Sequence, residues 1–439
     1  MENKMAAYLQ DLSKLIAIES VLDEKDEQYA FGEGNFRALR EIITIAERLG
    51  FDAYLDPQGR YAYAEVKGAS DQMMGVLGHV DVVPAGDLAK WDQDPFEMTI
   101  KDDQVYGRGV LDDKGPTLLS MYALKTLLDE GVDLKHSVRF IFGADEESFW
   151  RCMEAYKENE KLPDFGFTPD ASFPFIYAEK ELVQYELFGH ELSDVFLKGG
   201  TALNAVSDRA YLIYNQEVEK WLQDHDVPHF LEDQMLVIQG QSAHAMSPDK
   251  GVNAIYLGAK ALYETGHRNR MIDFIVEKLG DVFGQDLFGP IADDILGPLT
   301  VNLAMVEMNA RGQKIALDFR LPTVMNHDKL ELSLKKVTHP YQIVPKVYDH
   351  LPGVYLELDN PFIQALKEAY EEVTGEEALG ITSGGATYAR AMDNIIAFGP
   401  MFPGEVGSEH QANEHWSIES IERAWKVYYE AFKNVLVRK

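Results

Sequence analysis

Apolar runs that end in histidine and acidic residues constrain the fold of this chain more than any other feature. MMGVL at 73–77 is followed by His79 and Asp81, and SVRFIFGAD at 137–145 is followed by Glu146 and Glu147. Such runs are typical of buried strands in a largely parallel sheet. The polar residues come at the carboxyl ends of these strands, where α/β enzymes place their functional groups. The pattern predicts an α/β domain with its site at one edge of the sheet.

Helical patterns alternate with these strands. Helices are expected over the first 20 residues, at 35–49, from Gly115-Pro116 to Gly131, at 361–375 and at 417–436. Proline is well suited to the first position of a helix, and glycine to the position that follows its end. The predicted fold class is therefore α/β, with a mostly parallel sheet flanked by helices.

The pattern changes in the middle of the chain. At 439 residues the chain is too long for one core, so two or more domains are expected. Residues 299–322 read as two alternating strands around a turn at 310–313, an α+β signature. We predict a catalytic domain in two parts, 1–183 and 354–439, interrupted by an inserted α+β domain at 184–353.

Composition excludes some classes of partner. The formal net charge is −32, which argues against nucleic acid and anionic membranes as partners. No run approaches the length of a membrane span. The one cysteine, Cys152, rules out an internal disulfide and is expected to be buried and inert. Together with the lack of an N-terminal apolar segment, this predicts a cytoplasmic protein.

The residue types at the strand ends suit a metal site. On a strand, residues two apart share a face, so His79 and Asp81 emerge together. A neutral imidazole binds a divalent metal, and a nearby carboxylate orients its ring. Asp112 and Asp113 immediately precede the helix that begins at Gly115-Pro116. A cluster of His and Asp at strand ends is one way in which an α/β enzyme holds a metal.

Each of these residues has an ordinary explanation when taken alone. His79 could be a core or capping histidine, the Asp112-Asp113 pair a turn or helix cap, and Glu146-Glu147 a solvated surface pair. Near the C-terminus, His410 competes with His415 as a ligand. The metal-site interpretation gains weight because the motifs occur together in one chain.

Six motifs carry a resemblance to a known family. They are GHVDVVPAGD, GRGVLDDKGP, GADEESFWRC, FTPDASFP, GQSAHAMSPDKGVNA and SEHQANEH, and they extend from the first quarter of the chain to near its end. With them the chain resembles the M20 metallopeptidase family, most closely its bacterial PepV-type dipeptidases.

The resemblance implies a role for each residue of the metal site. It implies that the metal ligands are His79, Asp112, Glu147, Asp170 and His410, with Asp112 bridging two ions. It also implies that Glu146 is the base that activates a water between the metals, and that Asp81 supports His79. The Asp112-Asp113 peptide bond should be cis. The expected cofactors are two divalent ions, zinc first, with manganese or cobalt as alternatives because His and carboxylate ligands accept several metals.

The resemblance also assigns residues of the inserted domain to the substrate. His244 would stabilise the oxyanion, and Asn204 and Arg320 would hold the substrate and its terminal carboxylate. Gly384 and Gly385 are expected to contact substrate, although Ala386 stands where a further glycine is usual. The inserted segment is long enough to act as a lid within one chain, which implies a monomer with a self-sufficient active site.

The implied activity is hydrolysis of short peptides, most of all dipeptides with a free N-terminus. One alternative is a deacylase or desuccinylase of the same family that acts on N-acyl amino acids. A second is a non-catalytic binding protein that keeps the fold. Such a protein would be expected to lack the base or a metal ligand, and this sequence has residues for all of these roles.

Overall fold

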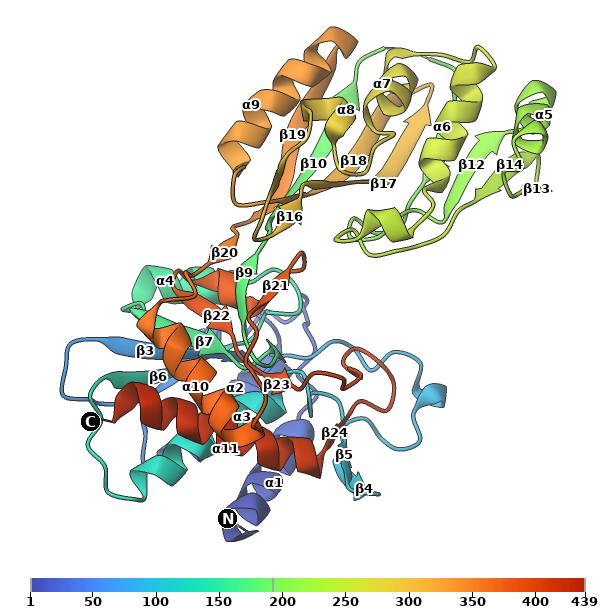
Figure 1. The fold of residues 1–439 in the computed structure, drawn as a ribbon. Coiled ribbons are helices and arrows are strands. Elements are labelled where there is room, and N and C mark those ends of the chain that lie inside the picture. The colour runs from blue at the N-terminus through green and yellow to red at the C-terminus, as the bar shows by residue number, and fades with distance from the viewer. Residues whose placement is uncertain (1, 192, 438–439) are drawn as a thin grey trace. The chain divides into compact units, whose positions relative to one another are not determined.

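The computed structural model describes residues 2–191 and 193–437, which divide into two compact units (Figure 1). The first unit contains the residues up to 177, 354–381 and those from 387 onward. The second contains 178–353 and 382–386, so the segment 184–353 lies within it. Across the described residues, no helix combines the length and apolar character that a membrane crossing requires.

The sheet of the first unit has parallel strands at its centre and antiparallel strands at its edges. Its order is β1-β2-β6-β3-β7-β22-β9-β20, with β21 paired to β9. Strands β6, β3, β7 and β22 run parallel, whereas β1, β2 and β9 join antiparallel. The bounds are β1 Asp52–Leu55, β2 Tyr61–Val66, β3 Met73–His79, β6 Ser137–Gly143, β7 Phe165–Thr168, β9 Ile176–Glu179, β20 Val354–Tyr355, β21 Ile381–Ser383 and β22 Ile395–Ala397. The α/β fold predicted from the sequence is confirmed, and its sheet is mixed, with the parallel strands at the centre.

Helices of the first unit pack around this sheet. Their bounds are α1 Glu2–Ile16, α2 Glu33–Leu49, α3 Lys114–Leu128, α4 Arg151–Asn159, α10 Pro361–Thr374 and α11 Ile418–Leu436. Helix α2 ends at Gly50, whose φ of 89° is the left-handed conformation that glycine adopts without strain. Helix α3 is buried almost all round and packs against α1 and α11. An interior helix of this kind fixes the position of the loop that precedes it.

Short elements connect two distant loops of the first unit. Strand β24 (His415–Ser417) pairs with β5 (Gln104–Tyr106), which forms a hairpin with β4 (Thr99–Lys101). This pairing places residues just before β24 beside residues just after β5. Two further strands, β8 (Ala171–Ser172) and β23 (Pro400–Met401), pair parallel to each other, and η1 (Leu88–Lys90) and η4 (Tyr388–Ala391) are single turns.

The second unit is built on an antiparallel sheet with the order β13-β14-β12-β11-β17-β18-β10-β19. The strands are β10 Glu181–Gly189, β11 Leu197–Gly199, β12 Arg209–Ile213, β13 His229–Glu232, β14 Met235–Gln239, β17 Thr300–Asn309, β18 Gly312–Leu321 and β19 Ile343–Leu351. The helices are α5 Gln216–Asp224, α6 Ala254–Glu264, α7 Arg270–Lys278, α8 Gln285–Phe288 and α9 His327–Thr338. The predicted hairpin at 299–322 is present as β17 and β18.

One face of this sheet forms the core of the second unit. Ile315, Leu317 and Phe319 of β18 belong to that core. Because side chains alternate along a strand, the residues that alternate with them, among them Ala316 and Arg320, face the opposite side. This opposite side carries polar and charged groups, and we call it the polar sheet face.

Candidate active site

Three of the predicted metal ligands come together where β3 and β7 end in the first unit. His79 is the last residue of β3 and has no exposed surface. Its Nε2 atom lies 3.0 Å from Oδ1 of Asp112 and 3.6 Å from Oδ2 of Asp170. Asp112 precedes α3, and Asp170 follows β7. The carboxyl ends of parallel strands therefore gather these groups at one edge of the sheet.

A second group forms on the other side of the Asp112 carboxylate. The Nε2 atom of His410 lies 2.9 Å from Oδ2 of Asp112 and 3.1 Å from the Glu147 carboxylate. Each oxygen of Asp112 thus faces a different imidazole. His415, the alternative ligand in the sequence, is directed elsewhere: its Nδ1 atom contacts the backbone oxygen of Asn413 at 2.9 Å.

Burial and the closeness of the carboxylates shift the pKa values of the acidic groups at this site. Burial, followed by the charges of neighbouring carboxylates, raises the pKa of Glu146 well above its usual value, and the pKa of Asp170 is raised for the same reasons. Burial also raises the pKa of Glu147 to about 7. For Asp112, hydrogen bonds from the two imidazoles outweigh burial and lower the pKa. Positive charge is needed to hold all these groups ionised together.

The donor atoms fit divalent metal ions. His79 belongs to two groups whose ligand atoms lie within 4.8 Å of one another, one with Glu146 and Asp170, the other with Asp112 and Glu147. Imidazole nitrogen and carboxylate oxygen are ligands that zinc, manganese and cobalt accept. A cluster of acidic groups around two imidazoles would be stabilised by such cations. The residues present thus match the metals expected from the sequence.

The immediate support of His79 differs in detail from the expectation. The Nδ1 atom of His79 lies 3.0 Å from the backbone oxygen of Asp81, whereas the Asp81 carboxylate is 3.5 Å away. The other carboxylate oxygen of Asp81 accepts a hydrogen bond from the backbone N–H of Glu147 at 3.0 Å. Asp81 therefore contacts both the first imidazole and the segment that carries the two glutamates.

Asp113, the residue after Asp112, holds the end of β3. Asp113 has no exposed surface, and its Oδ2 atom accepts from the Thr117 hydroxyl at 2.6 Å and from the His79 backbone N–H at 3.2 Å. The Asp112-Asp113 peptide bond is cis, as the resemblance implies. The two adjacent aspartates thus have different partners, because Asp112 contacts the imidazoles, whereas Asp113 contacts the backbone of β3 and the Thr117 side chain of α3.

Glu414 is a buried residue of the site that sequence reasoning missed. Its carboxylate accepts hydrogen bonds from the backbone N–H groups of Gly109, Leu111 and Asp112 at 2.9–3.1 Å, and from Arg108 at 2.7 Å. It thereby ties the loop of Asp112 to the loop that carries His410. The signal was present in the sequence, because Glu414 is the second glutamate of the SEHQANEH motif. The motif alone did not show that it points inward.

Four of the five residues assigned to the substrate line one hollow of the second unit, and Gly384 is not among its lining residues. The hollow has a volume of about 640 Å³, and Asn204, His244, Arg320 and Gly385 are among its lining residues. The loops of Asn204 and His244 are joined by backbone hydrogen bonds, from Ala245 to the Asn204 carbonyl and from Val206 to Ala243. The side chains of Asn204 and His244 are thus carried by one pair of neighbouring loops.

His244 is set up as a hydrogen-bond donor. The backbone N–H of Met246 donates to its Nδ1 atom at 3.1 Å, so the Nε2 atom carries the proton of the neutral ring. Burial, together with the nearby Arg320, lowers the pKa of His244 below its usual value. A neutral imidazole that carries its proton on Nε2 suits a role as donor to a developing negative charge.

Arg320 already has a partner in the structure. Its Nε and Nη2 atoms donate to the two oxygens of Asp318 at 2.6 and 3.1 Å, and Nη1 donates to the Gly384 carbonyl at 3.3 Å. A guanidinium has five N–H donors, and the partners found within residues 2–191 and 193–437 leave two of them, one on each Nη atom. The Arg320 guanidinium, which is expected to bind a substrate carboxylate, therefore already uses some of its N–H donors. Asp318 orients the guanidinium and with it the remaining N–H groups.

Comparisons with known proteins are consistent with this geometry. The sequence profile of the family described as "Peptidase family M20/M25/M40" matches residues 75–434. A relative from Staphylococcus saprophyticus, named "Putative dipeptidase", is 33% identical over 462 residues, covering 98% of this chain and 97% of its own.

Solved structures share the fold at lower sequence identity. An M20 family metallo-carboxypeptidase from Sulfolobus solfataricus has a TM-score of 0.60 at 19% identity and covers 98% of this chain and 99% of its own. An aminoacylhistidine dipeptidase from Vibrio alginolyticus has a TM-score of 0.62 at 13% identity, with 98% and 97% covered.

Proposed function

The chain belongs to peptidase family M20/M25/M40 and is a metallopeptidase, and on that premise we propose that it hydrolyses dipeptides with a free N-terminus through two divalent metal ions. The observation that carries the two-metal proposal is the position of Asp112. One of its oxygens lies 3.0 Å from His79 and the other 2.9 Å from His410. A carboxylate so placed can serve two ions at once.

The ligands divide into two sets that share Asp112. His79 and Asp170 would complete the first metal site, and Glu147 and His410 the second. Bound divalent ions would lower the pKa of a water molecule and polarise the peptide carbonyl. Zinc is the first candidate, and manganese and cobalt are compatible with the same ligands.

Glu146 is the base in this proposal. Burial, the largest cause, raises its pKa above the usual value, and a carboxylate beside the attacking water can serve as the general base. It accepts a proton from the attacking water and delivers it to the leaving amine. Glu147, its neighbour in the chain, faces His410 instead. Adjacent glutamates thus have separate tasks, one in proton transfer and one in metal binding.

The second unit supplies substrate contacts in this proposal. His244 donates its Nε2 proton to the oxyanion, and Asn204 and Gly385 border the same hollow. The two free N–H groups of Arg320 bind the terminal carboxylate of the substrate, for which a planar guanidinium is well suited. A carboxylate held at one fixed point would favour substrates of one length, and therefore dipeptides.

We also propose that each chain is self-sufficient as a monomer and works in the cytoplasm. A single cysteine, Cys152, suits a reducing compartment. In the structure this thiol is buried, and burial raises its pKa to about 12. It is therefore poorly reactive.

A substrate panel tests the proposal. The metal-free protein would be supplied with zinc, manganese or cobalt and assayed on dipeptides, tripeptides and N-acyl amino acids. We expect hydrolysis of dipeptides to exceed that of tripeptides, with no hydrolysis in the absence of metal. Preferred cleavage of N-acyl amino acids would instead identify a deacylase, and binding without any turnover would identify a non-catalytic protein.

A further inference from the structure

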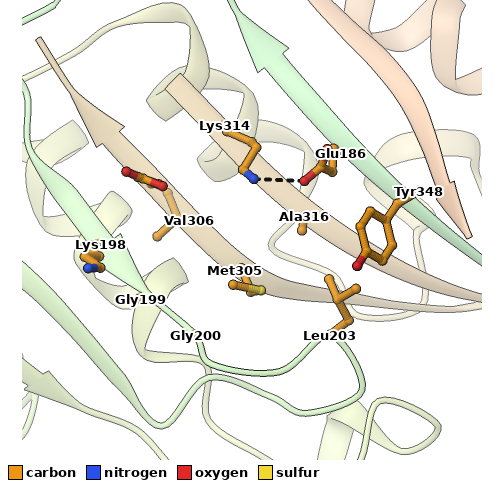
Figure 2. A pocket seen from close by; sticks show the side chains of 11 residues that line it. Glu186, Lys198, Gly199, Gly200, Leu203, Met305, Val306, Lys314, Ala316 and Tyr348 are labelled. Atoms are coloured by element: carbon orange, nitrogen blue, oxygen red, sulfur yellow. Dashed lines mark hydrogen bonds and ion pairs between the residues drawn. The ribbon is translucent and has the colours of Figure 1, made fainter. Parts of the chain in front are cut away.

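A second hollow lies on the polar sheet face, beside the substrate hollow of the same unit. Its volume is about 350 Å³, within the range of small-ligand sites. It shares Leu203, Met305 and Tyr348 with the substrate hollow, so the two adjoin. Figure 2 shows these three side chains with the pair Glu186 and Lys314, whose carboxylate and ammonium groups meet between neighbouring strands.

Small residues create this hollow. Ala316 stands opposite Met305 on β17 and opposite Glu186 on β10, and its methyl group leaves space between them. Gly200 has a φ of +80°, and a Cβ atom there would lie 2.0 Å from the Ala304 carbonyl. The loop after β11 therefore lies directly against β17. These features make the hollow a fixed part of the sheet.

Charges of both signs alternate across the hollow. Lys198 of β11 stands opposite Glu307 of β17, which stands opposite Lys314 of β18. Lys314 and Glu186 form an ion pair at 2.8 Å. Among residues 2–191 and 193–437, Lys198 and Glu307 take no ion-pair partner, and both are exposed. The two Lys and two Glu side chains sum to zero formal charge in a chain whose net charge is −32.

We propose that this hollow binds a free amino acid with an apolar side chain. Lys198 would bind the α-carboxylate and Glu307 the α-ammonium group. The apolar side chain would lie on Leu203, Met305 and Tyr348. A simple anion would meet two carboxylates and a simple cation two ammonium groups, whereas a zwitterion has a partner for each of its charges.

Because of the position of the hollow, a bound amino acid would affect the neighbouring loop that carries Asn204. Gly200 and Leu203 line it, and the loop between them leads directly to Asn204 in the substrate hollow. The Asn204 carbonyl accepts from the backbone next to His244. An amino acid held here would therefore restrict the loop that carries the substrate contacts. Hydrolysis of a dipeptide releases free amino acids, so the bound amino acid would be a product of the reaction. That product role rests on the proposed function, whereas the binding itself does not.

Direct binding tests the site without any hydrolysis. L-leucine would be titrated into the full-length protein by calorimetry, beside N-acetyl-leucine, which lacks the cation, and leucinamide, which lacks the anion. We expect L-leucine to bind about tenfold more tightly than either analogue, since each lacks one charge-assisted contact. Lys198→Gln and Glu307→Gln should each weaken L-leucine binding by about tenfold. Lys220→Gln and Glu232→Gln, exposed charges elsewhere in the unit, serve as matched controls.

Kinetics separate this hollow from the substrate hollow. Inhibition of hydrolysis by L-leucine should persist at saturating substrate and be lost in Lys198→Gln and in Glu307→Gln. Ala316→Leu, which fills the hollow, should abolish the same inhibition while the melting temperature confirms folding. Purely competitive inhibition that both charge variants retain would overturn the proposal, as would equal binding of L-leucine and N-acetyl-leucine. If the protein hydrolyses no dipeptide but the calorimetry succeeds, only the product role fails.

Discussion

Glu146 and Glu147 both follow strand β6, but their carboxylates lie near different groups. The carboxylate of Glu147 faces His410, whereas Glu146 offers an oxygen to the group around His79 and Asp170. By distance alone either glutamate could be a ligand. Their roles are therefore best separated by removing the negative charge of one at a time while keeping the size of the side chain.

Glu146→Gln should retain both metals and lose catalysis. An amide cannot accept the proton of the attacking water, so kcat should fall by at least about 100-fold. Metal content, measured by mass spectrometry after gel filtration, should match that of the unmodified protein. Glu147→Gln is the matched control and should lose one of the two metals. Equal metal loss in both variants would show that the roles of the two glutamates are misassigned.

In the proposed mechanism, Arg320 donates hydrogen bonds to Asp318 and to the substrate carboxylate at the same time. Asp318 has no exposed surface and also accepts from the side chain of Gln184 at 2.9 Å. Removing Arg320 therefore leaves a buried carboxylate short of a partner, which by itself costs stability. A change in the substrate avoids this complication, because it removes the carboxylate and leaves the protein intact.

Arg320→Ala should raise KM for a dipeptide by about 10- to 100-fold, the worth of a charge-assisted contact. The same variant should barely change KM for the corresponding dipeptide amide, which has no carboxylate to bind. Arg311→Ala, in the turn of the same hairpin, is the control. If Arg320→Ala weakens both substrates equally, the terminal carboxylate is bound elsewhere, with the loop at 383–387 as the next candidate.

At the scale of elements, two loops that lie far apart in the sequence form one structure. The loop before α3 carries Asp112, and the loop before β24 carries His410. The carboxylate of Glu414 joins them through the backbone N–H groups around Asp112 and the side chain of Arg108. Both Arg108 and Glu414 are buried, so their ion pair is little screened by solvent.

Glu414→Gln should weaken metal binding without removing any proposed ligand. A neutral amide holds the backbone N–H groups less strongly and leaves Arg108 buried without its charge partner. By analogy with other residues that support metal ligands, we expect a loss of metal affinity of about 10- to 100-fold. Competition with a chelator, at a temperature well below unfolding, measures this directly. Glu409→Gln changes an exposed residue of the same loop and should leave the metal affinity unchanged.

Local sequence patterns predicted most of the helices and strands. The features that these patterns did not predict depend on tertiary contacts. The apolar runs before His79 and Glu146 are strands β3 and β6, and the hairpin of β17 and β18 was visible as alternation. The antiparallel pairing of β2 with β6 and of β9 with β22 was not, because strand direction there depends on pairing between distant segments. Asp318 and Arg320 are two apart on β18 and so share a face, but this spacing does not fix the side-chain conformations. The sequence therefore did not reveal that Asp318 occupies part of the Arg320 fork.

At the scale of the whole molecule, the proposed machinery is divided between two units. The metal ligands and Glu146 belong to the first, and His244 and Arg320 to the second. One chain contains every residue that the mechanism needs. A partner subunit would be required only if His244 of one chain served the metals of another, so the question is whether both sets act within a single chain.

Co-expression of two inactive variants answers that question. Glu146→Gln disables the first unit and His244→Ala the second, so a self-sufficient chain should show only the sum of the two residual activities. If instead each site needed His244 from a second chain, half of the randomly formed dimers would be mixed. Each mixed dimer would hold one intact site, which restores about a quarter of full activity. Recovery of that size, with variants separately tagged to prove that mixed dimers form, would contradict the proposal of a self-sufficient monomer.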